Sequence, residues 1–191
     1  MKLQTLGVAA ALAIGGMAMT GCTTTPADSQ GSAQSARQAI DTNVGATLSR
    51  LYNTVPGTRE MVQKANGVLV FPSVVGGSLI VGAEYGKGAL RVNGRTENYY
   101  STTAGSIGLQ AGGQSRAIIY IFNTKEALDK FRNSNGWTVG ADATVTVAKV
   151  GANASVDSHT IQQPIVGYVL TNVGLEAGAS LQGAKINRIN P

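Results

Sequence analysis

Apolar side chains near the start of the chain follow a helical period. From Gln34 to Tyr52 they recur every three or four residues, at Ala36, Ile40, Val44, Leu48 and Leu51. That spacing places them on one face of an amphipathic helix. Pro56-Gly57 then interrupts the pattern, and we expect Thr58 to cap a short second helix.

From Gly67 onward the pattern is typical of strands. Short apolar runs separated by Gly, Pro and Asn cover residues 67–72, 79–81, 89–92, 95–101, 106–110, 117–122, 137–150, 160–170 and 175–189. Pro72 is expected to end the first of these strands. Asn93-Gly94 predicts a two-residue hairpin, because both turn positions need positive φ. One helix, from about Thr124 to Asn133, interrupts the strands, with Asn123 and Glu126 resembling a capping box.

These elements predict an α+β fold. Two N-terminal helices would pack on a mainly antiparallel sheet, with one inserted helix near residues 124–133. The 25 glycines of the chain exceed the average share of about 7%. Because many of them lie inside or beside the strand runs, we expect bulges, close backbone approach and a strongly curved sheet or barrel-like roll.

The first twenty-two residues have the pattern of a secretory signal. Lys2 precedes an apolar run rich in Ala and Gly, and Met19-Thr20-Gly21-Cys22 follows it. That order resembles the bacterial lipobox, in which the cysteine sulfur receives a diacylglycerol. We therefore expect residues 1–21 to be removed, Cys22 to be acylated, residues 22–33 to form a flexible tether and residues 34–191 to form one domain. Because Thr23 stands where an inner-membrane retention signal has Asp, we expect the periplasmic face of an outer membrane.

Composition excludes several classes of function. Charged residues make up 13% of the chain and aromatic residues 5%, so we expect no nucleic-acid binding. A single Cys and a single His argue against a disulfide framework, a Cys-based zinc site and a His-rich metal site. Asp157, Ser158 and His159 are consecutive, and consecutive strand residues point to opposite faces, so they do not predict a catalytic triad. We expect no enzymatic activity and no cofactor, unless a pocket gathers Asp142, His159 and Glu84.

The basic residues are the remaining candidates for a binding site. The chain carries a formal net charge of +5. One group lies in the helical region and a second surrounds the predicted hairpin: Arg37, Arg50, Arg59 and Lys64, then Lys87, Arg91 and Arg95. They are either solvated surface residues or contacts for anionic head groups, each contributing about 1 kcal/mol close to a membrane. If Arg91 and Arg95 pair across the hairpin, two like charges lie together.

An ordered set of sequence blocks resembles the SYLF domain family, also called the Ysc family domain. The blocks are residues 65–72, 82–90, 100–101, 106–110, 119–122, 127–131, 136–142 and 174–183. The chain is similar to the bacterial lipoprotein branch of that family. The resemblance implies a lipid-binding module, in which the helix near Gln34 to Tyr52 corresponds to a basic amphipathic segment of eukaryotic members.

Two functions follow as expectations. The first is a non-enzymatic, lipid-anchored envelope lipoprotein whose domain binds anionic phospholipid at a membrane surface. The alternative is a structural or interaction protein of the cell envelope that binds a protein partner through its sheet. The most informative structural observation is whether the fold encloses an apolar cavity large enough for an acyl chain or has a solid core.

Overall fold

The computed structural model describes residues 29–76, 82–106, 115–149, 158–176 and 178–191. The predicted signal segment, Cys22 and the predicted strand at 79–81 lie outside these residues. The helices are α1 (Ser29–Thr54), α2 (Thr58–Lys64), α3 (Lys125–Arg132) and α4 (Ser158–Ile161). The strands are β1 (Gly67–Gly76), β2 (Gly82–Val92), β3 (Arg95–Ser106), β4 (Arg116–Phe122), β5 (Trp137–Thr138), β6 (Thr146–Val147), β7 (Ile165–Thr171), β8 (Gly174–Leu175) and β9 (Lys185–Ile189).

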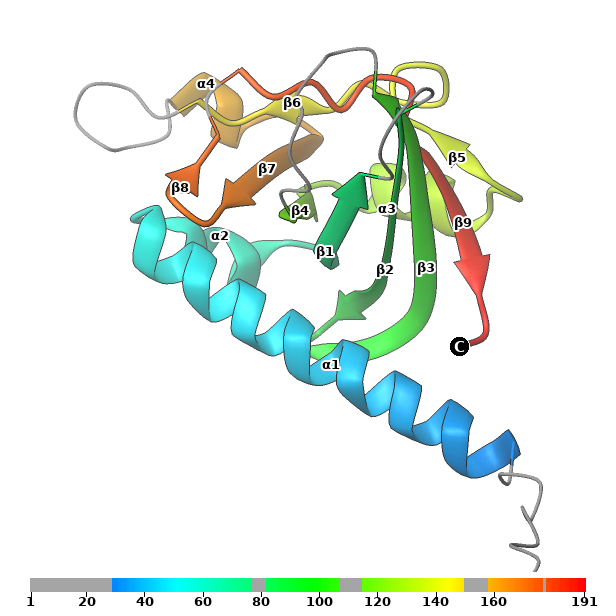
Figure 1. The fold of residues 1–191 in the computed structure, drawn as a ribbon. Helices are drawn as coiled ribbons and strands as arrows, with labels where there is room; N and C mark the ends of the chain where they lie inside the picture. Colours follow the sequence, from blue (N-terminus) through cyan, green and yellow to red (C-terminus); the bar gives the residue numbers. More distant parts are fainter. Residues whose placement is uncertain (1–28, 77–81, 107–114, 150–157, 177) are drawn as a thin grey trace, which may run out of the picture.

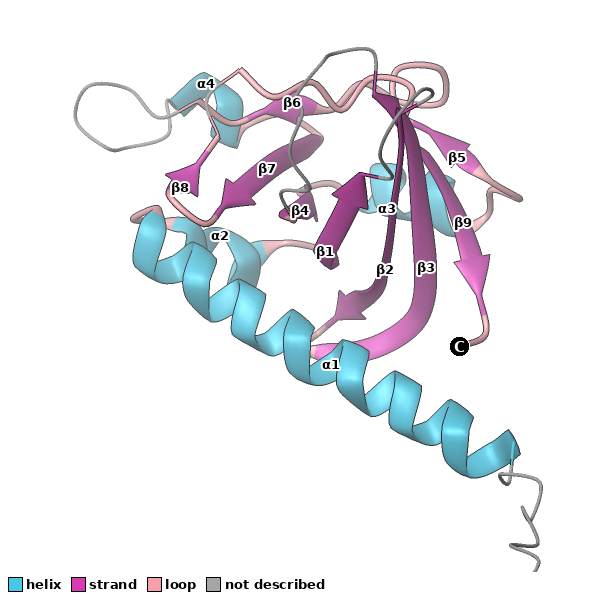
Figure 2. Cartoon of the chain, in the orientation of Figure 1, coloured by secondary structure: helices cyan, strands magenta, loops and turns pink. Residues whose placement is uncertain are grey.

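The nine described strands form one sheet. Their order is β5-β9-β3-β2-β1-β4-β7-β6, and β8 pairs with β7 (Figures 1 and 2). Every pair is antiparallel except β6 with β7, which is parallel. The α+β class and the mainly antiparallel sheet predicted from the sequence are confirmed.

The sheet is curled into a half-barrel. Trp137 lies on β5 and Tyr120 on β4, and four strands separate these two in the sheet. Their ring centroids are nevertheless only 6.1 Å apart. The sheet therefore bends far enough for its distant strands to meet across the inner face, as the abundance of glycine predicts.

The inner face of the half-barrel is filled by aromatic side chains. Ring contacts with centroid distances of 5.0–6.5 Å link six residues: Phe71, Tyr100, Tyr120, Phe122, Phe131 and Trp137. Each is at most 5% exposed, and Leu128 and Phe131 bring α3 into the same cluster. Among the described residues the inner face is thus a packed core.

The outer face is covered by α1 and α2. The aliphatic side chains of α1 pack on alternate residues of β1, β4 and β7, at Val44, Leu48, Leu51 and Val55. Figure 1 shows α1 running diagonally across this side of the molecule, with its N-terminal turns extending beyond the sheet. The helical period read from the sequence is confirmed. The helix begins at Ser29 rather than Gln34, so residues 29–33 of the predicted tether are helical, because each added residue gains one backbone hydrogen bond.

Pro72 does not end β1. The pairing register of β1 shifts at this point against both β2 and β4, which marks a bulge that accommodates a residue without an N–H. Opposite the bulge, a Cβ on Gly88 would lie 2.0 Å from the Val70 carbonyl oxygen, and one on Gly86 would lie 2.7 Å from that of Ser73. These two glycines permit the close backbone approach that the sequence predicts.

The turn predictions have mixed outcomes. Asn93 and Gly94 have φ values of 51° and 77°, so the hairpin is confirmed. Thr58 is not the cap of α2, because Gly57 holds that position with φ 82° and the Thr58 hydroxyl donates to the Val55 carbonyl at 2.7 Å. The capping residue of α3 is Thr124 rather than Asn123, whose amide donates instead to the Gln163 carbonyl at 2.7 Å.

Long strands are not found in the last third of the chain. The predicted runs 137–150 and 175–189 contain short strands joined by turns, and α4 occupies the start of the predicted strand at 160–170. In the described part of the chain, no helix combines the length and the apolar character needed to span a bilayer.

Candidate functional site

Three of the four candidate basic residues of the helices lie on the last turns of α1 and on α2. Arg50 belongs to α1, Arg59 lies near the start of α2 and Lys64 is its last residue; all three are exposed. The chain turns between the helices at Gly57, and Figure 1 shows α2 next to the end of α1. Glu60 is the acidic residue of this region. We call this surface, formed by residues 50–64, the α1–α2 corner.

Tyr52 organises one flank of the α1–α2 corner. The guanidinium carbon of Arg59 lies 4.7 Å from the centroid of the Tyr52 ring, a cation–π geometry. Burial raises the pKa of the Tyr52 phenol, while the charges of Arg59 and Arg91 act in the opposite direction. Tyr52 therefore remains neutral at physiological pH, and its ring face orients Arg59.

Arg91 fastens α1 to the sheet. Its Nη2 donates to the Asp41 carbonyl at 2.9 Å, and the Asp41 carboxylate accepts from the Thr96 hydroxyl at 2.7 Å and the Tyr99 phenol at 2.9 Å. Burial and the Asp41 carboxylate both raise the pKa of Tyr99. Arg91 is thus engaged in holding a helix. Sequence reasoning missed Asp41 and Tyr99, because their contacts join residues fifty or more positions apart.

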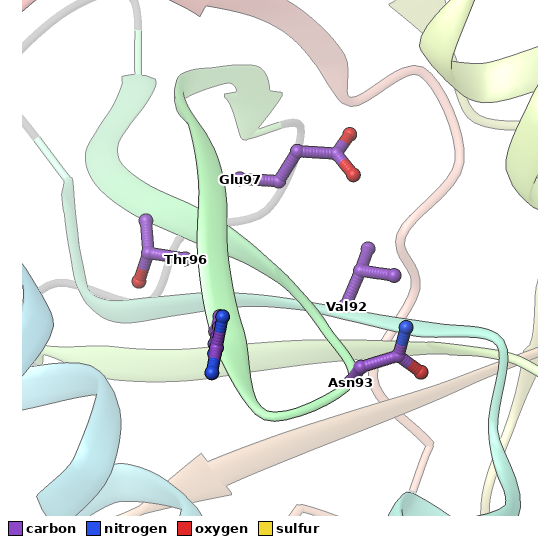
Figure 3. A pocket seen from close by; sticks show the side chains of 5 residues that line it. Val92, Asn93, Thr96 and Glu97 are labelled. Carbon is purple, nitrogen blue, oxygen red and sulfur yellow. The ribbon is translucent and has the colours of Figure 1, made fainter.

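The two arginines beside the hairpin point to opposite faces. Arg91 pairs with Thr96, on the side of α1, whereas Arg95 pairs with Val92, which packs against the inner core. The like-charge pair considered from the sequence does not form. Val92 and Glu97 point to one side of the hairpin and Thr96 to the other (Figure 3). Arg95 lines a shallow open hollow of about 480 Å³ with these residues and Asn93.

The remaining candidates lie elsewhere. Arg37 donates to the Asn190 side chain, which joins the N-terminal half of α1 to the end of the chain. Lys87 is exposed on β2, opposite Ser73 and Ser101. The structure therefore places Arg50, Arg59 and Lys64 on adjoining helix segments. It gives Arg37 and Arg91 roles in packing and places Lys87 and Arg95 on the sheet strands.

The residues considered for catalysis have separate partners. Glu84 forms an ion pair with Arg116, which also approaches Glu176 at 3.5 Å. The Asp142 carboxylate accepts from the Thr138 amide at 2.6 Å. The side chain of His159 lies outside the described residues. Over the described ranges, no three His, Cys, Asp or Glu side chains converge in a way that could hold a metal ion.

The fold and this surface define an α+β domain in which a long helix with an adjoining basic corner covers the outer face of a half-barrel. Residues 103–190 match the model of a family described as "Ysc84: Las17-binding protein actin regulator". The chain is also similar to Beta cell expansion factor A of Aeromonas veronii, a SYLF protein, at 28% identity over 155 residues, which is 80% of this chain and 57% of that relative. The chain thus spans little more than half the length of this curated relative. Together these matches support the resemblance to the SYLF family drawn from the sequence.

The family match begins within β3 and ends one residue after β9. All seven basic candidates precede residue 103, so they lie in the part of the chain that the family model does not match. Their roles have to be argued from this chain's own structure.

Proposed function

We propose that this protein is a non-enzymatic, lipid-anchored envelope lipoprotein whose domain binds anionic phospholipid through the α1–α2 corner. The resemblance to the SYLF family, which is linked to lipid binding, supports the general class. The observation that carries the specific proposal is that Arg50, Arg59 and Lys64 are all exposed on two adjoining helix segments, with Glu60 as the acidic residue between them. Basic residues near an anionic surface contribute about 1 kcal/mol each.

The packed inner core favours surface contact over lipid transport. The aromatic cluster occupies the inner face of the half-barrel, where an acyl chain would otherwise lie. Head-group recognition at the exterior fits this arrangement better than an enclosed chain. The proposed anchor is the acylated Cys22, seven residues ahead of the first described residue of α1. The proposed location is the periplasmic face of an outer membrane.

Vesicle flotation tests the proposal. The chain from Thr23 onward, which keeps every described element, is mixed with neutral vesicles or with vesicles that contain cardiolipin. We expect it to float with the cardiolipin vesicles at low salt and to be released as the salt concentration rises, because screening weakens charge contacts at a surface. Equal recovery with both kinds of vesicle would refute the proposal.

A charge-matched pair of variants tests the location of the site. Arg50→Gln, Arg59→Gln and Lys64→Gln together remove three positive charges from the α1–α2 corner, and we expect roughly a hundredfold loss of partitioning. Arg95→Gln, Lys149→Gln and Lys185→Gln remove the same charge from other exposed positions. We expect this second variant to retain most of the binding. Equal losses in the two variants would mean that net charge, and not the α1–α2 corner, governs binding.

A protein-binding role is the second candidate. Val75 and Tyr85 are cross-strand partners on β1 and β2 and are 46% and 44% exposed, which leaves an apolar pair on the sheet surface. The family is associated with protein binding as well as lipid binding. Crosslinking in intact cells with a photoreactive residue at position 85 should yield one defined adduct if this role is correct, together with no preference for anionic vesicles.

A further inference from the structure

Val173 is an aliphatic residue at the tip of a turn. It lies between β7 and β8, where Thr171 pairs with Gly174, and it is 98% exposed. Turns favour Gly, Pro, Asn, Asp and Ser, each for a backbone or hydrogen-bonding reason, and a β-branched side chain supplies none of these. Gly174 supplies the positive φ of this turn, at 130°. Nothing in the folding of the turn accounts for valine at this position.

The turn lies beside the α1–α2 corner. A Cβ on Gly174 would be 3.9 Å from the Thr54 methyl group, and Leu175 packs against the outer core together with α1. Thr54 and Arg50 are four residues apart on one flank of α1, where the Thr54 hydroxyl donates to the Arg50 carbonyl at 2.8 Å. Figure 1 shows β8 next to the end of α1 and to α2. The exposed aliphatic tip is therefore adjacent to an exposed arginine.

Arg59 lies on the other flank of α1. Tyr52, over which it stacks, is two residues from Thr54, and residues two apart point to opposite sides of a helix. The end of α1 is thus bordered by the β7–β8 turn with Arg50 on one flank and by Arg59 on the other. The outward face between these flanks carries Asn53, and the neighbouring outward positions of α1 are Ser49 and Ala46, all exposed and uncharged. No acidic side chain of α1 faces this way, since Asp41 is turned toward β3.

We propose that Val173 inserts into the interfacial region of an anionic bilayer while Arg50 and Arg59 contact lipid phosphates. This inference rests on the proposed function and names the part of the molecule that enters the membrane. An anionic lipid surface is the occupant that fits, because it offers phosphate groups to the arginines and, directly below them, the glycerol-proximal part of the acyl chains to the valine. The exposed outward positions of α1 at Asn53, Ser49 and Ala46 are uncharged, so this contact is compatible with α1 lying along the membrane that holds the proposed anchor at Cys22.

Tryptophan at the tip reports insertion directly. Val173→Trp is made in the chain from Thr23 onward, where the native Trp137 is 1% exposed in the inner core and supplies a constant background. We expect its fluorescence to shift to shorter wavelength on addition of cardiolipin vesicles and to be quenched by lipids brominated near the head group. The matched control is Val75→Trp, since Val75 is also an exposed valine but lies near the far end of β1, roughly 25 Å from α2 along the strand. We expect its fluorescence to be unchanged.

Polar replacement measures the contribution of the valine to binding. Val173→Asn suits the turn, so the fold is kept, and we expect about a tenfold loss of partitioning into cardiolipin vesicles. Val75→Asn should partition like the unmodified chain. If the unmodified chain floats while Val173→Trp shows neither shift nor quenching, the insertion of Val173 is refuted and the proposed function stands. If the unmodified chain does not float with cardiolipin vesicles, both are refuted.

Discussion

The two faces of the half-barrel are closed by different kinds of contact. The inner face is filled by aromatic rings from strands and α3, which pack at centroid distances of 5.0–6.5 Å. The outer face is closed by aliphatic side chains of α1 and by polar contacts along one flank of that helix, where Asp41 and Arg91 lie. The inner face is held by many elements, whereas the outer face depends on how one helix is attached.

Because of this difference, the inner face contributes to folding alone, whereas the outer face also carries the candidate residues for recognition. The aromatic side chains that fill the inner face are each at most 5% exposed, so they offer little surface to a ligand. Six of the seven basic candidates lie on the outer side of the molecule, on α1, α2 and the outward side of β2. Arg95 points to the other side of the sheet. Some of these arginines attach the helix and others remain exposed. A substitution on the outer face therefore has to be tested both for loss of packing and for loss of binding.

Truncation of a core residue on each face gives the largest expected effect. Trp137→Ala on the inner face should lower the free energy of unfolding by about 3–5 kcal/mol, and Leu51→Ala on α1 by about 2–5 kcal/mol. Both residues are at most 1% exposed. Denaturant titration measures the loss, and hydrogen exchange separates the faces: Leu51→Ala should accelerate exchange in α1 before the sheet opens. If Trp137→Ala releases α1 first, the two faces are not independent as argued.

As the pH rises, a buried tyrosine on the outer face should ionise before one on the inner face. Burial raises the pKa of Tyr168, in the outer core, to about 12, and raises that of Tyr120, in the inner core, still further. Between pH 10 and the raised pKa, the phenol stays protonated in the folded protein but loses its proton in the unfolded protein. The stability that this tyrosine contributes is therefore fully present below pH 10 and is lost as the pH rises through the folded pKa. Tyr168→Phe should remove about 2–3 kcal/mol of the decline between pH 10 and 12. An unchanged slope in this variant would contradict the assignment.

The polar attachment of α1 should have a moderate effect. Asp41→Ala leaves the Thr96 and Tyr99 hydroxyls without their acceptor while keeping the backbone carbonyl that binds Arg91, and we expect a loss of about 1–2 kcal/mol. The pKa of Tyr99 should fall, because the Asp41 carboxylate helps to raise it. Absorbance titration of tyrosinate, with Tyr99→Phe to identify the signal, measures this change. A pKa of Tyr99 that does not move would show that burial alone raises it.

Local features of the fold could be predicted from the sequence. The helical period of α1 and the Asn93-Gly94 hairpin depend on neighbouring residues, and both are confirmed. The wrong predictions concern residues whose local role is replaced by a contact with a distant part of the chain. Asn123 has the chemistry of a helix cap, but the Ile161 and Gln163 carbonyls bind its amide, and the next residue caps α3 instead. Pro72 has the chemistry of a strand end, but a bulge opposite Gly86 and Gly88 accommodates it.

The candidate site could be predicted only in part. The basic residues of the α1–α2 corner are visible in the sequence, because helix and turn boundaries are local. The engagement of Arg91 by Asp41 depends on how α1 crosses the sheet, and no spacing in the sequence reveals a contact across fifty residues. Val173 falls in the predicted connection between the strands at 160–170 and 175–189, and nothing in the sequence distinguishes its side chain from those around it. The pairing of Thr171 with Gly174 places it at the tip of a two-residue turn, where it is 98% exposed.

The smallest expected effect concerns Arg59, which lies where packing and recognition meet. Arg59→Gln removes the cation–π contact with Tyr52 and should cost about 0.5–1 kcal/mol of stability, because the pair lies partly exposed at the surface. It should also weaken flotation with cardiolipin vesicles by roughly fivefold, the share expected of one basic residue at the membrane. Tyr52→Leu separates the two roles, since it removes the ring but keeps the charge. We expect this variant to lose similar stability and to retain most of the binding. If binding falls equally in the two variants, the Tyr52 ring, which orients the guanidinium, is as necessary for membrane binding as the charge of Arg59.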